Sequence, residues 1–487
     1  MRTLILSINS QYVHTLLAPR YLLANMDSQN AEILETNVNV DINNVLSDII
    51  SKKPDIVAIS CYIFNIAFIR ELLPMLRNAL KNAVIIMGGY EVAFDSDRYI
   101  DVVDYIIKGE GDIVFSALIK DIESGKKAFP KVIEAGTVNN LEEIKSPYDQ
   151  EYSVLGKTKI LYMETSRGCP FCCSYCMSAN TKSVRAFNLS RVFEDLAKIT
   201  LYNPKQIKLV DRTFNYNIKR ATKIFEHIID NYQGRGINFH FEMAPELFDE
   251  DMFVALNKAK KGLLRFEIGI QSYNKQTLSK VNRKANLARI DSNLSRLIKM
   301  QSIQIHVDLI AGLPEENFAS FIKGFDRLIS IRPDCLQLGF LKILKGSKIS
   351  SEAENYQIQD KPPYEIISSP DINEKELKSL KLAEEALDLY YNSQRFCSSM
   401  DYIFSLIDSP YQFFQGLGEE LQEKYGGKKA TSSYTQSDCL YNFCMRFLLK
   451  DADRDKREEC FQELEIIINK DFALSGNIRK WKRHLPN

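Results

Sequence analysis

The sequence predicts an α/β protein in three parts: a doubly wound parallel sheet, a partial (β/α)6 barrel and a mostly helical C-terminal region. Apolar strand patterns alternate with helical patterns over residues 1–115 and again from residue 159, and the alternation ends near residue 346. The length of 487 residues suits about three domains at roughly 150 residues each. We expect the three parts at 1–150, 151–345 and 346–487.

The first part has four apolar, β-branched strand patterns, each ending in glycine or a small or polar residue. They cover residues 3–9, 55–62, 83–89 and 103–109, and helical patterns at 42–51 and 66–80 lie between them. Such strands are typical of a parallel sheet covered by helices on both faces, and ligands of these sheets bind at the carboxyl ends of the strands. We interpret the short polar stretches of residues 116–158, which include two prolines, as a connector.

Six strand patterns in the second part predict a partial barrel rather than an eight-fold one. They cover residues 159–166, 206–213, 237–243, 263–272, 303–312 and 335–341. The third part has amphipathic helical patterns, which we expect to cover the barrel mouth. Its aromatic residues fall at mixed helical spacing, and we expect them to pack in the core or, alternatively, to stack on a substrate: Tyr402, Phe404, Tyr411, Phe413 and Phe414.

Composition and charge exclude several classes of protein. Hydrophobic residues make up 45% and charged residues 26%, as in ordinary folded chains and unlike disordered ones. The 63 basic and 63 acidic residues cancel, so no overall positive field attracts nucleic acid or an anionic membrane. No apolar run approaches the roughly 20 residues of a membrane span, and residues 3–9 match a first strand better than a signal peptide. We therefore expect a cytoplasmic protein with reduced thiols and with neither a membrane nor a nucleic-acid partner.

The strongest signal is a cysteine cluster in residues 164–179, ETSRGCPFCCSYCMSA. Cys169, Cys173 and Cys176 have CxxxCxxC spacing, and three thiolates on one loop suit a [4Fe–4S] cluster with one iron open to another ligand. A structural zinc site is the alternative, but it needs a second cysteine or histidine pair, which is absent nearby. Cys172 is either a bystander or an alternative ligand.

This spacing, with Tyr175 just before the last cysteine, resembles the radical S-adenosylmethionine (SAM) superfamily. The resemblance implies that the open iron binds the amino and carboxylate groups of SAM. It also implies an external electron donor of the flavodoxin or ferredoxin type, and a 5′-deoxyadenosyl radical that abstracts hydrogen from an unactivated carbon.

Further segments resemble elements that contact SAM in this superfamily, namely FEIGIQS at 266–272 and LIAGLPEE at 309–316. The resemblance implies SAM contacts by Tyr175, Asp211, Arg212, Glu267, Gln271, Asp308 and Ile310. For Glu267 and Asp308 the alternative is a hydrogen-bonding role in the barrel core. His240 and His306 lie in strand patterns, where we expect interior histidines with satisfied hydrogen bonds or, alternatively, proton-transfer groups.

The first part resembles the cobalamin-binding domain that precedes the barrel in one large subgroup, through GGYE at 88–91 and GEGD at 109–112. The resemblance implies cobalamin contacts in the loops at the strand ends: Asn9, Ser10, Gln11, Tyr12, His14, Ser60, Tyr62, Gly88, Gly89, Gly109, Glu110 and Gly111. The motif D-x-H-x-x-G, which supplies an axial histidine in some cobalamin enzymes, is absent. His14 is either an axial ligand or a cap of the following helix.

The whole chain resembles a branch of this subgroup whose C-terminal region has no known function. The resemblance implies a cobalamin-dependent radical SAM enzyme with a small-molecule, natural-product or peptide substrate. Its reaction is expected to be methyl transfer to an unactivated carbon or, alternatively, a rearrangement or cyclisation. A non-catalytic iron–sulfur protein is the alternative of another class.

Overall fold

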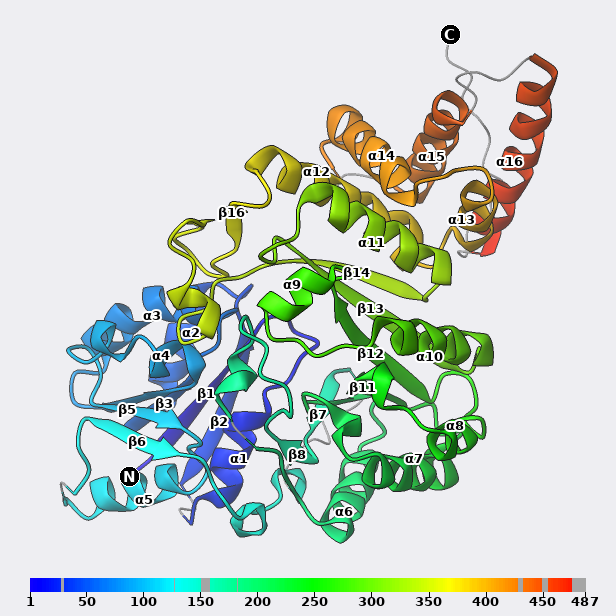
Figure 1. Ribbon diagram of the computed structural model, residues 1–487. Helices are drawn as coiled ribbons and strands as arrows, with labels where there is room; N and C mark the ends of the chain where they lie inside the picture. The colour runs from blue at the N-terminus through cyan, green and yellow to red at the C-terminus, as the bar shows by residue number, and fades with distance from the viewer. Residues whose placement is uncertain are drawn as a thin grey trace.

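The computed structural model describes residues 1–27, 30–126, 128–149, 158–181, 183–427, 432–448 and 454–474. Figure 1 shows three parts: a sheet with its helices in blue to cyan, a barrel in green, and a group of helices in orange to red. The green barrel lies between the other two parts (Figure 1). No helix within the described ranges is long and apolar enough to cross a membrane.

The N-terminal part is a six-stranded parallel sheet in the order β2-β1-β3-β4-β5-β6. Its strands are β1 (Thr3–Asn9), β2 (Ala31–Asn37), β3 (Ile56–Ser60), β4 (Val84–Gly88), β5 (Tyr105–Gly109) and β6 (Val132–Gly136). Its helices are α1 (Leu17–Asn25), α2 (Ile42–Ser51), α3 (Ile66–Ala79), α4 (Tyr90–Ala93) and α5 (Val114–Glu123). Buried apolar side chains form a separate core on each face of the sheet, which confirms the doubly wound prediction.

Two elements of this sheet differ from the sequence prediction. The connector expected at 116–158 is wrong in its first part, because it contains most of α5 and the whole of β6. The edge strand β2 was also not predicted. Both β2 and β6 are edge strands with mostly half-exposed residues, so they lack the continuous apolar run that marks central strands.

The second sheet confirms the six-stranded partial barrel, with all strands parallel in the order β14-β13-β12-β11-β10-β7. The strands are β7 (Ile160–Met163), β10 (Gln206–Leu209), β11 (Asn238–Met243), β12 (Leu264–Gln271), β13 (Ile303–Ala311) and β14 (Cys335–Phe340). The helices around it are α6 (Leu189–Thr200), α7 (Ile218–Tyr232), α8 (Glu250–Leu256), α9 (Lys275–Lys280), α10 (Leu287–Met300) and α11 (Phe318–Ile331). On β12 and β13 every second residue is buried against the helices, so the other residues face the barrel interior.

The loop after β1 joins the two sheets directly. The Ile160 N–H donates to the Val13 carbonyl at 2.8 Å, and the Thr15 hydroxyl donates to the Ile160 carbonyl at 3.0 Å. The carboxyl end of β1 therefore lies beside the first barrel strand, and ligand sites of both sheets meet at this junction.

The C-terminal part contains α12 (Glu374–Ala386), a π-helical turn (Leu387–Asn392), α13 (Cys397–Phe404), α14 (Pro410–Tyr425), α15 (Ser433–Phe447) and α16 (Arg454–Leu474). Asp326 of α11 accepts hydrogen bonds from the Ser409 hydroxyl and the Tyr411 N–H, each at 2.7 Å. The Asn392 side chain bonds the backbone of Leu336 in β14. The expectation that these helices cover the barrel mouth is therefore wrong, because their apolar faces pack beside α11 and β14. Tyr411, Phe413 and Phe414 are buried, as predicted for core residues.

Between β14 and α12 lies a two-stranded hairpin that the sequence did not indicate, β15 (Gln357–Ile358) with β16 (Ile366–Ser368). In Figure 1 this yellow segment reaches from the barrel toward α3 and α4.

Candidate cofactor site

A cavity of about 970 Å³ lies where the carboxyl ends of the N-terminal strands face the rim of the barrel. Its walls come from the loops after β1, β3, β4 and β5 and from the first barrel strands. Ten residues with predicted cofactor contacts line it: Ser10, His14, Ser60, Tyr62, Gly88, Gly89, Gly109, Glu110, Gly111 and Arg212. The structure thus gathers residues from the ends of five strands, β1, β3, β4, β5 and β10, around one space.

Three residues of the loop after β1 are not among those that line the cavity. The Asn9 side chain donates to Glu35 at 3.0 Å, and Tyr12 is 65% exposed beneath the ammonium group of Lys159. Gln11 is exposed to solvent. Gln11 and Tyr12 thus face solvent and Asn9 is buried at the end of β1, whereas Ser10 and His14 line the cavity.

Two glycines in the cavity wall have conformations that other residues rarely adopt. Gly89 has φ 105° and Gly109 has φ 100°. A Cβ on Gly89 would overlap the Cys61 carbonyl, and one on Gly109 would overlap the Gly136 carbonyl. Glycine therefore lets these loops pack against neighbouring strand ends and leaves backbone at the cavity wall.

His14 lies between the cavity and the barrel interior. Its Nδ1 is 2.7 Å from the hydroxyl of Tyr162, a residue of β7 that also lines the cavity. Burial and the nearby Lys208 charge lower the pKa of His14, so the imidazole is neutral at neutral pH. It does not cap the next helix, because α1 begins after Leu16 without a side-chain hydrogen bond.

An ion cluster not predicted from the sequence joins the two domains at the cavity edge. Arg167, in the short strand β8 (Ser166–Arg167), bonds both oxygens of Asp112 at 2.8 and 3.0 Å and Glu164 at 2.7 Å. Arg185 bonds Glu110 at 2.5 and 2.9 Å. Burial alone would raise the pKa of Glu110, but Arg185, the Val138 N–H and Arg167 together outweigh it and the pKa is lowered. The Glu110 carboxylate therefore links the N-terminal domain to the barrel.

The cysteine loop is held by backbone from two other segments. The Ser174 N–H donates to the Val281 carbonyl, and the Ile349 N–H donates to the Ser174 carbonyl, each at 2.9 Å. The Asn282 side chain donates to the Cys172 carbonyl at 3.0 Å. Cys172 is exposed, and all the cysteines in the described ranges are free thiols.

Two cations lie near the three spaced thiols. An Arg283 nitrogen is 3.8 Å from the Cys173 sulfur, and the charge of Arg212 reaches both Cys169 and Cys176. Burial raises the pKa of Cys173, and Arg283 opposes this shift. In the part of the chain that is described, no three side chains converge as they would on a single metal ion.

The Asp211 carboxylate is hydrogen-bonded by neighbouring groups of the protein. It is buried and accepts hydrogen bonds from the Thr165 N–H at 2.9 Å, the Thr165 hydroxyl at 2.7 Å and the Ser166 hydroxyl at 2.6 Å. Burial raises the pKa of Asp211, and these donors oppose the shift. Its role in the structure is to hold the segment that leads into the cysteine loop.

Glu267 is also paired within the barrel. Its carboxylate lies 2.9 Å from Lys208 and 3.0 Å from His240. Burial alone would raise the pKa of Glu267, but these two partners lower it to about 2. His306 accepts a hydrogen bond from Arg265 at 2.9 Å, as expected for an interior histidine, whereas the buried Nε2 of His240 lies 3.0 Å from Glu267 without the geometry of a hydrogen bond.

Other predicted SAM residues have polar atoms that are buried and unsatisfied. Within the described ranges, Asp308 Oδ1 and Gln271 Oε1 have no hydrogen-bond partner. Burial, with a smaller effect of Glu267, raises the pKa of Asp308 well above its usual range. Tyr175 and Ile310 are half-buried against the core. Unsatisfied buried polar atoms at strand ends are the arrangement expected where a polar ligand binds.

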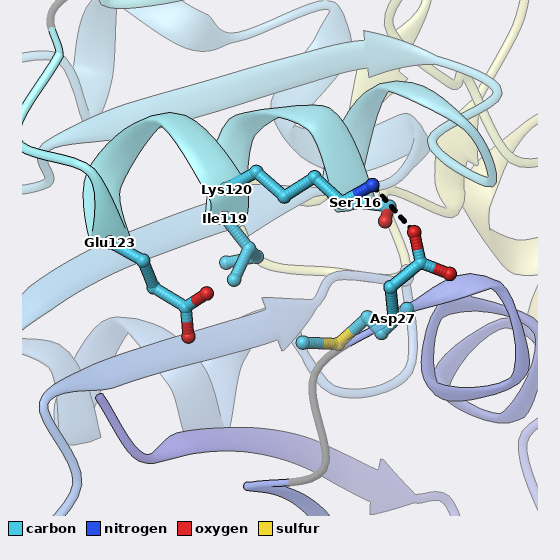
Figure 2. A pocket seen from close by; sticks show the side chains of 6 residues that line it. Asp27, Ser116, Ile119, Lys120 and Glu123 are labelled. Atoms are coloured by element: carbon cyan, nitrogen blue, oxygen red, sulfur yellow. Dashed lines mark ion pairs between the residues drawn. The ribbon is translucent and has the colours of Figure 1, made fainter.

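A second cavity, of about 100 Å³, lies at the surface of the N-terminal part between α5 and the end of α1 (Figure 2). Lys120 and Asp27 form an ion pair at 2.5 Å beside it. It is too small for either organic cofactor and lies apart from the cysteine loop.

Comparison with known families agrees with this geometry. The B12-binding domain model matches residues 3–119, the radical SAM superfamily model matches 163–328, and a family of proteins of unknown function (DUF4080) matches 354–487.

Individual relatives are distant. The cobalamin-dependent radical SAM methyltransferase TokK of Streptomyces tokunonensis is 21% identical over 380 residues, which cover 68% of this chain and 54% of TokK. The chain spans about half the length of the curated relatives it matches.

Two solved structures share the fold. TsrM of Kitasatospora setae, a radical SAM methyltransferase with cobalamin and a [4Fe–4S] cluster bound, has a TM-score of 0.62 at 17% identity, covering 87% of this chain and 99% of that one. The cobalamin-dependent SAM radical enzyme OxsB has a TM-score of 0.64 at 16% identity, covering 98% of this chain and 83% of that one.

Fold, cysteine loop and family matches together define a radical SAM protein with an N-terminal B12-binding domain. Residues 354–487 match the DUF4080 family, so the domains follow in the order B12-binding, radical SAM and DUF4080. The resemblance stated from the sequence is thereby confirmed.

Proposed function

We propose that the protein is a cobalamin-dependent radical SAM methyltransferase that acts on an unactivated carbon of a small molecule, a natural-product intermediate or a peptide. The observation that carries the proposal is the cavity at the strand ends, which is lined both by the glycine loops of the B12-binding domain and by Gly168, next to Cys169. One continuous space therefore touches both expected cofactor sites. The names of the relatives support methyl transfer as the reaction.

The residues present fit the three groups. Cys169, Cys173 and Cys176 would hold a [4Fe–4S] cluster, and the unsatisfied Asp308 and Gln271 oxygens, with Tyr175, Arg212 and Ile310, would contact SAM. The cavity has the size and the backbone-lined loops that a corrin ring needs. Once bound, these groups supply the radical that activates the substrate carbon and the methyl group that replaces its hydrogen.

The chain's own residues position these groups. Asp211 anchors the strand end before the cysteine loop, while Arg212 and Arg283 place positive charge beside the thiols, where it would offset the negative charge of a thiolate-bound cluster. Glu267 is fixed by Lys208 and His240, so we assign it to shaping the barrel interior rather than to direct SAM binding.

An external reductant of the flavodoxin or ferredoxin class would deliver the electron that starts the reaction. The exposed Cys172 marks the side of the cysteine loop that faces solvent. Because a cluster of this kind needs low-potential electrons and reduced thiols, we place the protein in the cytoplasm.

Anaerobic reconstitution with iron, sulfide and hydroxocobalamin tests the proposal. We expect about four irons and one cobalt per chain, with loss of nearly all iron in Cys169→Ala, Cys173→Ala and Cys176→Ala. Cys172→Ala is the matched control and should keep its iron. With substrate, the product should gain one methyl mass alongside S-adenosylhomocysteine and 5′-deoxyadenosine. Zinc in place of iron, or iron without cobalt, would contradict the proposal, and a product of unchanged carbon count would replace methyl transfer with rearrangement.

A further inference from the structure

Residues 342–372, called the strap here, connect the last barrel strand with α12 and pass over the cysteine loop. The Asn180 side chain donates to the Gly346 carbonyl at 3.1 Å, and the Ile349 N–H donates to the Ser174 carbonyl at 2.9 Å. Both partners belong to the segment around Cys176. The start of the strap is therefore fixed to the proposed cluster site.

The same strap contacts the N-terminal domain. Lys345 pairs with Asp95 at 2.8 Å, and Gly346 lies so close to the Phe94 ring that a Cβ would overlap it. Further along, the Tyr364 hydroxyl accepts from Arg70 of α3 at 3.0 Å and donates to Glu91 of α4 at 3.1 Å. In Figure 1 the yellow strap lies beside α3 and α4, in agreement with these contacts.

The helix that Tyr364 contacts is part of the cavity wall. Gly89, Tyr90, Ala93 and Phe94 all line the cavity, and they span the beginning and end of α4. This helix has only four residues and no side-chain cap, so its own hydrogen bonds cannot hold it in place. Its position depends on tertiary contacts such as the bond from Tyr364 to Glu91.

The bridge is well protected from water. Tyr364 is 9% exposed, and Glu91 is half-buried. Burial raises the pKa of Glu91, and the hydrogen bond from Tyr364 together with the Arg70 charge opposes the shift. A shielded hydrogen bond to a carboxylate is stronger than one at the surface, so its loss is expected to be measurable.

We propose that Tyr364, in the C-terminal region whose family has no known function, is a positioning residue for the cobalamin site. It holds α4 through Glu91 and Arg70 and so shapes one wall of the cavity. This inference rests on the proposed function, because it takes the cavity to be where cobalamin binds. It gives the DUF4080 region a role in assembling a cofactor site in another domain.

Tyr364→Phe in the full-length chain tests the inference, since it removes only the bridging hydroxyl. We expect the dissociation constant for hydroxocobalamin, measured by absorbance titration, to rise about fivefold, as for one lost hydrogen bond. In the cofactor-free protein, the amides of residues 89–95 should exchange hydrogen faster. Tyr411→Phe is the matched control, because its hydroxyl bonds Ser379 at 2.9 Å within the C-terminal helices, away from the cavity.

The outcomes separate the inference from the proposed function. Weaker cobalamin binding and faster exchange in Tyr364→Phe alone, with equal stabilities of the two variants, support it. Unchanged binding and exchange, or equal losses in both variants, overturn it. If the wild-type chain binds no hydroxocobalamin, the proposed cobalamin site fails instead. The exchange rates at 89–95 then still decide whether Tyr364 holds α4.

Discussion

Glu242 is a barrel carboxyl whose ionisation is sensitive to the physiological range of pH. It lies on β11, and its nearest cation, Arg212, is 4.0 Å away, too far for a strong hydrogen bond. Burial raises its pKa from 4.5 to about 7, and Arg212 only partly opposes the shift. Because burial raises the pKa of Glu242, its ionised carboxylate destabilises the folded state.

We therefore predict that Glu242→Gln stabilises the cofactor-free protein at pH 8 but not at pH 4.5. The folded pKa lies above the unfolded value, so the wild-type protein loses stability as pH rises from about 4.5 to 7, and the amide removes this loss. The gain at pH 8 should be on the order of 2 kcal/mol. Urea unfolding at both pH values measures it.

Glu250→Gln is the control for this measurement. Glu250 lies on the surface beside Arg296, whose hydrogen bond lowers the pKa of Glu250, so this side chain is charged at pH 8 and more than half charged at pH 4.5. If the free energy of unfolding of Glu242→Gln depends on pH in the same way as that of Glu250→Gln and wild type, the raised pKa of Glu242 is contradicted.

At the scale of elements, the strand β8 is held to the loop after β5 by the pair Arg167–Asp112. Both side chains are shielded, with 12% and 9% of their surfaces exposed. Such a pair is a weak source of net stability, but removing one partner leaves the other as an uncompensated buried charge. The pair therefore mainly fixes the position of one domain relative to the other.

We predict that Arg167→Gln lowers the free energy of unfolding by about 3 kcal/mol. Adding Asp112→Asn to this variant should cost much less than it does in wild type, because the pair is already broken. A double-mutant cycle by urea unfolding measures this coupling.

Arg191 provides the matched comparison for the cycle. It is similarly shielded, but it pairs with Asp195 at 2.8 Å within α6. Arg191→Gln and Asp112→Asn should therefore have additive effects. Additive effects of Arg167→Gln and Asp112→Asn as well would refute the proposed pairing across the interface.

At the scale of the whole molecule, the barrel and the C-terminal helices share one continuous apolar core. Phe325 of α11 packs against Tyr411 and Phe414 of α14, and these rings belong to the same buried cluster as the barrel strands. The N-terminal sheet has two cores of its own. The chain is thus three parts by topology but two units by packing.

Calorimetry of the cofactor-free protein should resolve these two units. Phe414→Ala, at a cost of about 4 kcal/mol, should lower the transition of the barrel with its C-terminal helices and leave the other transition unchanged. Phe115→Ala, in the N-terminal core, should lower the transition of the N-terminal domain and leave the transition of the barrel with its C-terminal helices unchanged. A single transition that both variants shift equally would show that the domains unfold together.

What the sequence determined by itself is local. Cys169, Cys173 and Cys176 lie within eight residues, and Gly89 and Gly109 stand directly at strand ends, so spacing alone indicated the cluster loop and the glycine walls. Central strands such as β3 and β13 were predicted because every residue, or every second residue, is buried. Edge strands β2 and β6 have no such signal, since they are half-exposed.

Tertiary structure alone decided the contacts between distant segments. Arg167 and Asp112 are 55 residues apart, and Tyr364 and Glu91 are 273 apart, so no local pattern relates them. Asp211 and Glu267 stand at positions typical of ligand contacts, yet both already pair with neighbouring side chains, Glu267 through one of its two oxygens. The physical reason is that residue spacing and burial produce a periodic pattern along the sequence. The partner of a charged group, by contrast, depends on which segments the fold brings within about 4 Å of it.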